Sequence, residues 1–196
     1  MTNDIENAWV KQAMNGNIEA FEQLIYQYEK KVYSIAFNMF GNEHDAYDVS
    51  QEVFIKLYKN INSFKFDSSF STWLHRITTN TCIDEYRKKK RHNQMAYSLD
   101  DPIDYEGNEI DRQIKDSNHT PEESIVHKEQ VNEVRKAILM LKEDHKMIII
   151  LRDIRGHSYE EIAQILKCSV GTVKSRLSRA RNALKDIIIE QREHKT

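Results

Sequence analysis

The 196-residue sequence contains only five glycines and two prolines, and it has almost no stretches in which apolar and polar residues alternate. A strand with one buried face needs that alternation, and the tight turns between strands favour glycine and proline. Long stretches of the chain instead repeat apolar residues at intervals of three and four positions, as helices with one buried face do. The sequence therefore predicts an all-α protein.

Cysteine is also scarce, and the two that are present, Cys82 and Cys168, lie far apart without CxxC spacing. We expect both thiols to serve in packing rather than in a disulfide or a metal site. The eight histidines are scattered singly, and the chain has neither a glycine-rich phosphate loop nor an HExxH motif. We therefore expect a protein that is not an enzyme and that binds no metal or cofactor.

Long apolar runs are missing as well, because no stretch approaches the length that a membrane span requires. The first residues include Asp4 and Glu6, whereas a secretory signal begins with basic residues before its apolar segment. We expect a cytoplasmic protein that does not insert into a membrane.

The net charge of −2 conceals a sharp division along the chain. Residues 87–91 read RKKKR, whereas residues 93–121 carry seven acidic side chains and only two basic ones. That acidic stretch holds both prolines and shows no helical periodicity. We interpret residues 93–120 as an acidic flexible linker between two small helical domains, residues 1–92 and 121–190.

Apolar periodicity predicts the helices of the first domain. One helix follows Asn17 and stops at Gly41, and a second begins after Asn42. After the polar loop at residues 62–69, a third helix starts at Phe70. Trp73 lies on the apolar stripe of that third helix, so we expect it in the core rather than stacked on a nucleic-acid base.

The second domain is predicted to open with a helix from Pro121 to about Leu141, followed by another that ends before Gly156. Ser158 and Glu161 then have the spacing of a capping box, in which each side chain bonds the backbone of the other residue. A short helix is expected to begin there.

A turn at Lys167 and Cys168 separates this short helix from a basic one that Ser169 caps. Residues 167–185 contain six Lys or Arg side chains and no Asp or Glu. Wound as a helix, the segment gathers its apolar residues on one face: Val170, Val173, Leu177, Ala180 and Leu184. The opposite face carries short hydroxyls between long cations: Lys174, Ser175, Ser178 and Arg179.

A solvated surface helix would show the same amphipathic pattern. The tight turn and the capped helix before it favour a helix-turn-helix, whose second helix enters the major groove of DNA. There, serine can approach base edges, and Arg or Lys can meet phosphate or guanine.

Four segments together resemble the extracytoplasmic-function (ECF) group of bacterial RNA polymerase sigma factors. They are AFEQLIYQYEKKVYSIA, DAYDVSQEVFIKLY, FSTWLHRITTNTCIDEYRKKKR and SYEEIAQILKCSVGTVKSRLSRARNAL, at residues 20–36, 45–58, 70–91 and 158–184. The resemblance covers nearly the whole chain except the linker. It implies a two-domain factor that binds core RNA polymerase, directs it to promoter DNA through the minus-ten and minus-thirty-five elements, and initiates transcription.

The resemblance implies that the helix containing residues 45–58 docks on the clamp helices of the largest polymerase subunit, and that the flap of the second-largest subunit is a further contact. By position, the core-binding residues would be Asp48, Gln51, Glu52 and Ile55. A polar outer face that merely meets water is the alternative interpretation of that helix.

The loop and the third helix resemble the element that recognises and melts the minus-ten region. Melting unpairs and unstacks bases, so the protein must offer a pocket and stacking surfaces in return. The resemblance implies a capture loop formed by Phe64, Phe66, Ser68 and Ser69. It implies that the separated strand is held by Arg76, Asn80 and Arg87, with phosphate contacts from Lys88, Lys89, Lys90 and Arg91.

The helix-turn-helix is implied to recognise the minus-thirty-five element as duplex. Its base readers by position are Lys174, Ser175, Ser178 and Arg179, the face that helical winding also selects, and its phosphate contacts are Thr172 and Arg176. Acidic linkers in the family thread through polymerase channels that otherwise carry nucleic acid, although a solvated tether explains the composition equally well.

Two positions depart from the common pattern of the family: Lys142 replaces a frequent proline, and Lys167 replaces a frequent glycine. We expect Lys167 to adopt a nearly left-handed conformation, at a cost of about 1 kcal/mol. The resemblance also implies control by an anti-sigma protein, often membrane-bound. A stand-alone helix-turn-helix regulator is the alternative function, but the sequence shows no heptad seam for a dimer.

Overall fold

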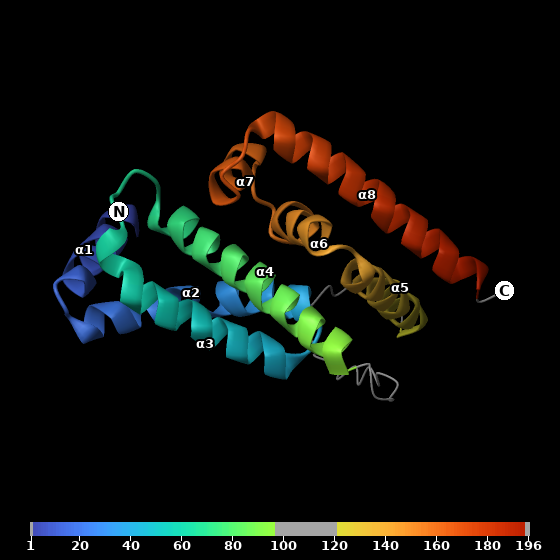
Figure 1. Ribbon diagram of the computed structural model, residues 1–196, viewed down its shortest axis with the longest axis horizontal. Helices are drawn as coiled ribbons and strands as arrows, with labels where there is room; N and C mark the ends of the chain where they lie inside the picture. The colour runs from blue at the N-terminus through green and yellow to red at the C-terminus, as the bar shows by residue number, and fades with distance from the viewer. Residues whose placement is uncertain (1, 97–120, 195–196) are drawn as a thin grey trace.

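The computed structural model describes the backbone of residues 2–96 and 121–194 and the side chains of residues 4–92 and 129–194. Within those ranges all regular structure is helical, which confirms the predicted all-α class (Figure 1). The elements in chain order are α1 (Thr2–Met14), α2 (Ile18–Phe40), α3 (Glu43–Asn60), η1 (Ile61–Ser63), α4 (Phe70–Ala96), α5 (Pro121–Met140), α6 (Glu143–Ile149), η2 (Ile150–Ile154), α7 (Tyr159–Ile165) and α8 (Val170–Glu193). We call α1–α4 the N-terminal unit and α5–α8 the C-terminal unit.

The ends of α2 and α3 confirm the predicted helix signals. The Asn17 side chain accepts a hydrogen bond from the Ala20 backbone N–H at 2.8 Å, and Asn42 caps α3 in the same way. Gly41 ends α2 with φ +79°, a left-handed conformation in which its N–H donates to the carbonyl of Phe37. The single glycine between the two helices therefore turns the chain so that α3 packs back on α2.

α1 was not predicted from the sequence. It packs on α2 through Val10 and Ala13, and its Glu6 side chain is buried and accepts hydrogen bonds from Tyr28 and Gln27. Burial, and then the hydrogen bond to Glu6, raise the pKa of Tyr28. α1 buries few apolar side chains and packs partly through a carboxylate. Its sequence therefore lacks the broad apolar stripe that predicted α2.

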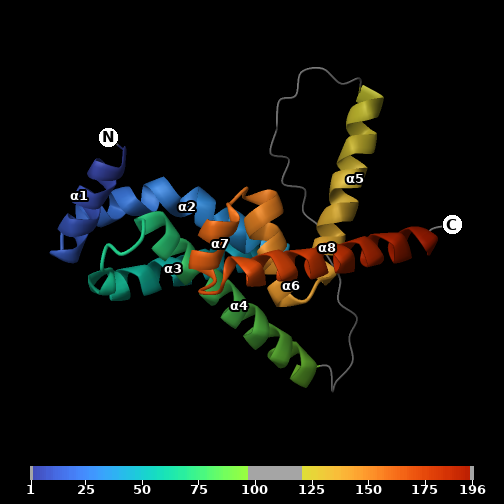
Figure 2. The same cartoon turned by 90° about the horizontal axis from the view of Figure 1, so that it is seen from above.

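The C-terminal unit also follows its sequence signals. Ser158 and Glu161 form the predicted capping box at the start of α7, with hydrogen bonds of 3.1 Å and 2.7 Å. α6 continues into η2, a π-helical turn in which the Arg155 N–H donates to the carbonyl of Ile150 at 2.9 Å. α5 stands out from the other helices in the second view (Figure 2), and α8 packs on α5, α6 and α7.

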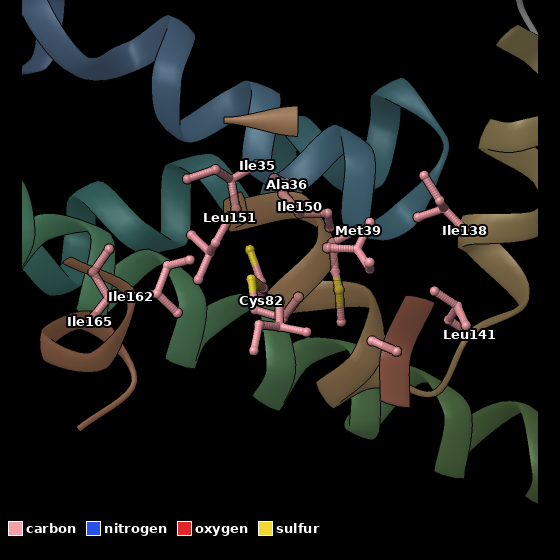
Figure 3. Packing of buried hydrophobic residues seen from close by; sticks show 14 of the residues in the cluster. Ile35, Ala36, Met39, Cys82, Ile138, Leu141, Ile150, Leu151, Ile162 and Ile165 are labelled. Atoms are coloured by element: carbon pink, nitrogen blue, oxygen red, sulfur yellow. The ribbon is translucent and has the colours of Figure 1, made fainter. Parts of the chain in front are cut away.

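The two units share one hydrophobic core, an arrangement that the sequence did not predict. In Figure 3, Ile35, Ala36 and Met39 of α2 and Cys82 of α4 lie among Ile150, Leu151 and Ile162 of the C-terminal unit. A second cluster, which includes Val53 and Leu57, lies entirely within the N-terminal unit. α4 packs on α2 and α3 and also on α6 and α7, and α2 contacts α5, α6 and η2 directly.

The first domain was expected to end at residue 92 and the linker to begin at residue 93, but α4 continues to Ala96. Most of the predicted acidic linker, residues 97–120, lies outside the described residues. Trp73 is 6% exposed and packs in the core, as expected. In the part of the chain that the structure describes, no helix combines the length and the apolar character needed to cross a membrane.

Candidate nucleic-acid and polymerase interface

α8 presents the polar face that helical winding predicted. Val173, Leu177 and Ala180 are buried against the C-terminal unit. All four predicted base readers are exposed on the other side: Lys174, Ser175, Ser178 and Arg179. An amphipathic helix with one face buried and long cations projecting from the other has the shape that fits a major groove.

Local contacts orient the side chains at the start of α8. The Ser169 side chain accepts a hydrogen bond from the Thr172 N–H at 3.1 Å and lies 2.9 Å from the Thr172 hydroxyl. The Lys174 ammonium lies over the ring of Tyr159 at 5.8 Å from its centroid. Arg176 is exposed. The predicted phosphate contacts and base readers therefore lie together around the first turns of α8.

The turn between α7 and α8 confirms the expectation for Lys167, whose φ is +49°. This left-handed conformation costs a non-glycine residue about 1 kcal/mol relative to an ordinary one. Further along α8, Arg181 pairs through both guanidinium ends with Asp153 of η2, with a hydrogen bond of 3.1 Å from Nε. Arg181 therefore ties α8 to its own unit and does not belong to the free cationic face.

The loop before α4 divides its two aromatic rings between core and surface. Phe64 is 5% exposed, and its ring lies 5.1 Å from that of Trp73. Phe66 is 40% exposed, with its ring 4.7 Å from that of Phe64 and the Lys11 ammonium 5.7 Å from its own centroid. Phe64 thus anchors the loop in the core, and Phe66 is the ring that a ligand can reach.

Phe66 also has a positive φ of +59°, which is rare for a bulky residue. Strain of this kind persists where surrounding structure imposes it, and it concentrates at ligand-binding sites. Ser69 accepts a hydrogen bond from the Thr72 N–H at 3.1 Å and so caps α4, whereas Ser68 is half-buried beside it. Positive φ has no signature at this phenylalanine in the sequence, so only the structure reveals the strain.

The cations of α4 extend from Arg76, near the loop, toward the far end of the helix. Arg76 is half-buried, whereas Asn80 and Arg87 are exposed; the intervals of four and seven residues place all three on one side of the helix. The residues predicted to contact phosphates follow directly: Lys88, Lys89, Lys90 and Arg91. Lys88 pairs with Glu85 at 3.5 Å, and Lys89 pairs with Asp45 of α3.

Arg87 is engaged by the C-terminal unit. Its Nε donates to Glu143 at 3.0 Å and its Nη2 to Asp144 at 3.4 Å, both in the first turn of α6. The pKa of Glu143 is lowered by its own backbone N–H first and then by Arg87. In this arrangement the carboxylates of Glu143 and Asp144 accept the hydrogen bonds of the Arg87 guanidinium, which was predicted to hold nucleic acid.

The outer face of α3 carries the four predicted polymerase contacts. Asp48 lies 3.5 Å from His44, Glu52 lies 3.7 Å from Lys56, Gln51 is exposed and Ile55 is 46% exposed. The sequence analysis missed two neighbours, Tyr47 and Tyr58, which are each 59% exposed. Their signal was available, because the intervals from Tyr47 to Gln51, Ile55 and Tyr58 keep all four on one side of a helix.

Comparison with known proteins decides the family. Residues 24–92 match the family model for sigma-70 region 2, and residues 132–184 match that for sigma-70 region 4. The ECF RNA polymerase sigma factor SigW of Bacillus subtilis is 40% identical over 90% of this chain and 92% of its own. The ECF RNA polymerase sigma-E factor of Escherichia coli is 39% identical over 89% of this chain and 90% of its own.

The chain belongs to the ECF group of the sigma-70 family.

Region 2 of this sigma factor lies inside the N-terminal unit and region 4 inside the C-terminal unit. The match to region 2 begins in α2, so α1 is outside it. The family prediction made from the four sequence segments is confirmed, and with it the prediction of a transcription initiation factor.

Two solved structures have the same fold. A complex of the sigma factor RpoE with the anti-sigma factor NepR from Bartonella quintana matches with a TM-score of 0.61 at 26% identity, over 87% of this chain and 98% of that one. A complex of CnrH with the cytosolic domain of CnrY has a TM-score of 0.65 at 24% identity, over 95% of this chain and 99% of that one.

Proposed function

We propose that this sigma factor binds core RNA polymerase, directs it to promoters through separate minus-ten and minus-thirty-five contacts, and melts the minus-ten DNA. The observation that carries the proposal is that one chain of this family presents three distinct surfaces. They are the cationic face of α8, the strained loop with the cations of α4, and the aromatic outer face of α3. The role involves no bond chemistry, because binding energy alone selects the promoter and favours the open strand.

In this proposal α8 reads the minus-thirty-five element as duplex. Lys174, Ser175, Ser178 and Arg179 contact base edges, and Thr172 and Arg176 contact phosphates. Base contacts give discrimination of about 1–3 kcal/mol for each good pair, whereas phosphate contacts add salt-sensitive affinity without reading sequence. The exposure of the reading face and the fixed start of α8 support this division.

The loop and α4 act on the minus-ten element. A flipped base costs a few kcal/mol to extrude, and stacking on an aromatic ring returns about 1–3 kcal/mol. Phe66 supplies that ring, and Ser68 and Ser69 border it, while Phe64 supports the loop from the core. Arg76, Asn80 and Arg87 hold the separated strand, and Lys88, Lys89, Lys90 and Arg91 meet its phosphates.

The outer face of α3 docks on the clamp helices of the largest polymerase subunit. Interface energy concentrates in a few aromatic and apolar anchors surrounded by polar contacts. Tyr47, Ile55 and Tyr58 are such anchors on α3, and Asp48, Gln51 and Glu52 give the face an acidic, amide-bearing border. The C-terminal unit makes the further contact with the flap of the second-largest subunit.

This factor is proposed to act in the cytoplasm, where core polymerase transcribes DNA. An anti-sigma partner is proposed as well, because the solved structure with 26% identity is a complex of a sigma factor with an anti-sigma factor. Residues 1–92 and 121–190 are proposed as the two working domains, with the acidic residues 93–120 between them.

The experiment that tests this function is transcription from fragmented genomic DNA by purified core polymerase, with and without the protein, with the 5′ ends of the products mapped. New discrete start sites that share two upstream motifs at fixed spacing are expected. If no new starts arise and the free protein nonetheless binds specific duplex sites, it is a stand-alone regulator and the docking role of α3 is wrong.

A further inference from the structure

A pair of histidines, one buried and one half-buried, joins the two units. His75 of α4 is 3% exposed, and its ring lies edge-to-face with that of His157, with 4.9 Å between centroids and 72° between planes. His157 lies between η2 and α7, and 16% of its side chain is exposed. The contact therefore crosses the boundary between the N-terminal and the C-terminal unit.

His75 belongs to a stripe of α4 that faces the C-terminal unit. His75, Thr79, Cys82 and Tyr86 follow one another at intervals of four, three and four residues, which keeps them on one side of the helix. Cys82 is 0% exposed and lies in the shared core (Figure 3). At the far end of the stripe, the Lys146 ammonium of α6 lies 4.2 Å from the ring centroid of Tyr86 and donates to the Met39 carbonyl at 3.3 Å.

Three buried nitrogen atoms gather at the histidine end of the stripe: His75 Nδ1, His157 Nε2 and Arg155 Nε. Among the described residues, these are the buried side-chain N and O atoms that have no hydrogen-bond partner. Buried polar atoms are normally paired, so a cluster of three at one boundary is unusual. Arg155 is fixed there by its Nη1, which donates to Ser34 of α2 at 3.3 Å.

Burial opposes a proton on either ring, and the nearby positive charges add to that effect at His75, whereas Glu161 favours a proton on both rings. Burial first, and then the positive charges of His157, Arg155 and Lys31, lower the pKa of His75 to about 3. Burial also lowers the pKa of His157, although Glu161, 3.9 Å from its Nδ1, acts in the opposite direction. His75 therefore fits the closed arrangement as a neutral ring, and burial favours the neutral form of His157 as well.

We propose that His75 and His157 form an acid-sensitive latch between the two units. As neutral rings they pack together and hold the C-terminal unit against α4. A proton on His75 places a charge in a buried site beside a guanidinium and a second histidine, and separation of the units returns that charge to water.

The direction of the pH effect follows from linkage. In the open form both histidines have an ordinary pKa near 6.5, so below that pH the open form takes up protons that the closed form does not bind. Closure is therefore fully favoured above about pH 6.5 and weakens as the pH falls. Between pH 7.5 and 5.5 the ratio of closed to open protein falls about tenfold through His75 alone, and toward about 100-fold if His157 contributes equally.

Opening would release surfaces that the closed arrangement occupies. Arg87 is held by Glu143 and Asp144 of the C-terminal unit only while the units are together. Asp67 and Ser68 of the loop face Lys167 and Ser169 of the helix-turn-helix across a cleft of about 590 Å³. This consequence rests on the proposed function, whereas the latch itself does not.

The test uses Cys82 as a reporter in the full chain. Its rate of thiol labelling, resolved by mass spectrometry and divided by the rate in the denatured chain at the same pH, measures how often the units open. We expect this opening constant to rise at least about tenfold between pH 7.5 and 5.5. Burial lowers the pKa of Lys146 to about 8, so this group titrates largely above that window.

The double variant His75→Gln/His157→Gln removes both titrating rings and should leave the opening constant unchanged across the window. His44→Gln, whose side chain is 85% exposed in the wild type, is the matched control and should respond like the wild type. Amide exchange at Val53, in the core of the N-terminal unit, should stay slow throughout, which separates opening from unfolding. An equal pH response in the wild type and the double variant would overturn the latch.

If the double variant does not fold, titration of the wild-type His75 ring by NMR decides. A ring that stays neutral below pH 5 supports the latch, and an ordinary pKa near 6.5 overturns it. Neither measurement involves polymerase or DNA, so failure of the latch and failure of the sigma function are distinguishable.

Discussion

Arg87 of α4 donates from Nε to Glu143 of α6 at 3.0 Å, although the two residues lie 56 positions apart. The bond links the cations proposed to hold promoter DNA to the unit proposed to read a different promoter element. The carboxylates of Glu143 and Asp144 occupy the positions in which phosphate oxygens would contact the Arg87 guanidinium. Packing of the two units and binding of minus-ten DNA therefore compete for Arg87.

The double variant Glu143→Gln/Asp144→Asn should raise the affinity of the free protein for a single-stranded minus-ten oligonucleotide. An exposed ion pair contributes up to about 1 kcal/mol, so the expected gain is up to about fivefold. Fluorescence anisotropy at fixed salt measures it. Asp186→Asn/Glu190→Gln removes the same charge from exposed positions of α8, and a similar gain in that variant would assign the effect to net charge alone.

Replacement of Phe64 should lower the free energy of unfolding much more than replacement of Phe66. Phe64→Ala leaves a cavity beside Phe70 and Trp73 and should lower the free energy of unfolding by about 3–5 kcal/mol. Phe66→Ala removes a ring that is already 40% exposed and should cost less than about 1 kcal/mol. Urea unfolding followed by circular dichroism measures both. Equal losses would mean that Phe66 is as much a part of the core as Phe64.

Promoter opening should depend on Phe66 and Asn80. Phe66→Ala and Asn80→Ala should leave closed-complex formation intact and reduce permanganate reactivity of the unpaired thymines. The reduction should be about tenfold or more for Phe66→Ala, because a lost stacking contact is worth about 1–3 kcal/mol, and about fivefold for Asn80→Ala, because a lost hydrogen bond is worth about 1 kcal/mol. Lys30→Ala, at an exposed position of α2, is the control. Unchanged reactivity would remove these residues from the melting step.

Base reading at the upstream element should depend on Lys174 and Arg179. Lys174→Ala and Arg179→Ala should each reduce the preference for the correct minus-thirty-five sequence over a scrambled one about tenfold or more, with core binding preserved. Lys142→Ala, exposed at the start of α6, should keep the full preference. A loss that is equal on both sequences would reassign the residue to a phosphate contact.

Polymerase docking should concentrate in the aromatic residues of α3. Tyr47→Ala and Tyr58→Ala should each weaken the affinity for core polymerase about tenfold or more, because anchors of this kind carry most of the energy of an interface. Binding of labelled protein to core enzyme measures this, with Glu29→Ala on the exposed side of α2 as the control. Affinities within twofold of the wild type would place the docking surface elsewhere.

Sequence reasoning succeeded where a signal is local. Asn17, Gly41, Asn42 and the pair Ser158 and Glu161 end or begin helices through contacts within four residues, and each does so in the structure. The cationic face of α8 follows from periodicity in the same way. The left-handed conformation of Lys167 was expected from the resemblance instead, because that position of the turn is frequently glycine in the family.

The sequence by itself thus determined the helices from α2 onward, their buried faces and the family. Only the tertiary structure decided which aromatic ring of the loop is buried, that α1 packs through Glu6, and that Arg87, His75 and Cys82 face the other unit. The physical reason is that caps and periodicity act between neighbours in the chain. Contacts between α4 and α6 or α7 instead join segments far apart in the chain, and no spacing of residues along one helix specifies its partner.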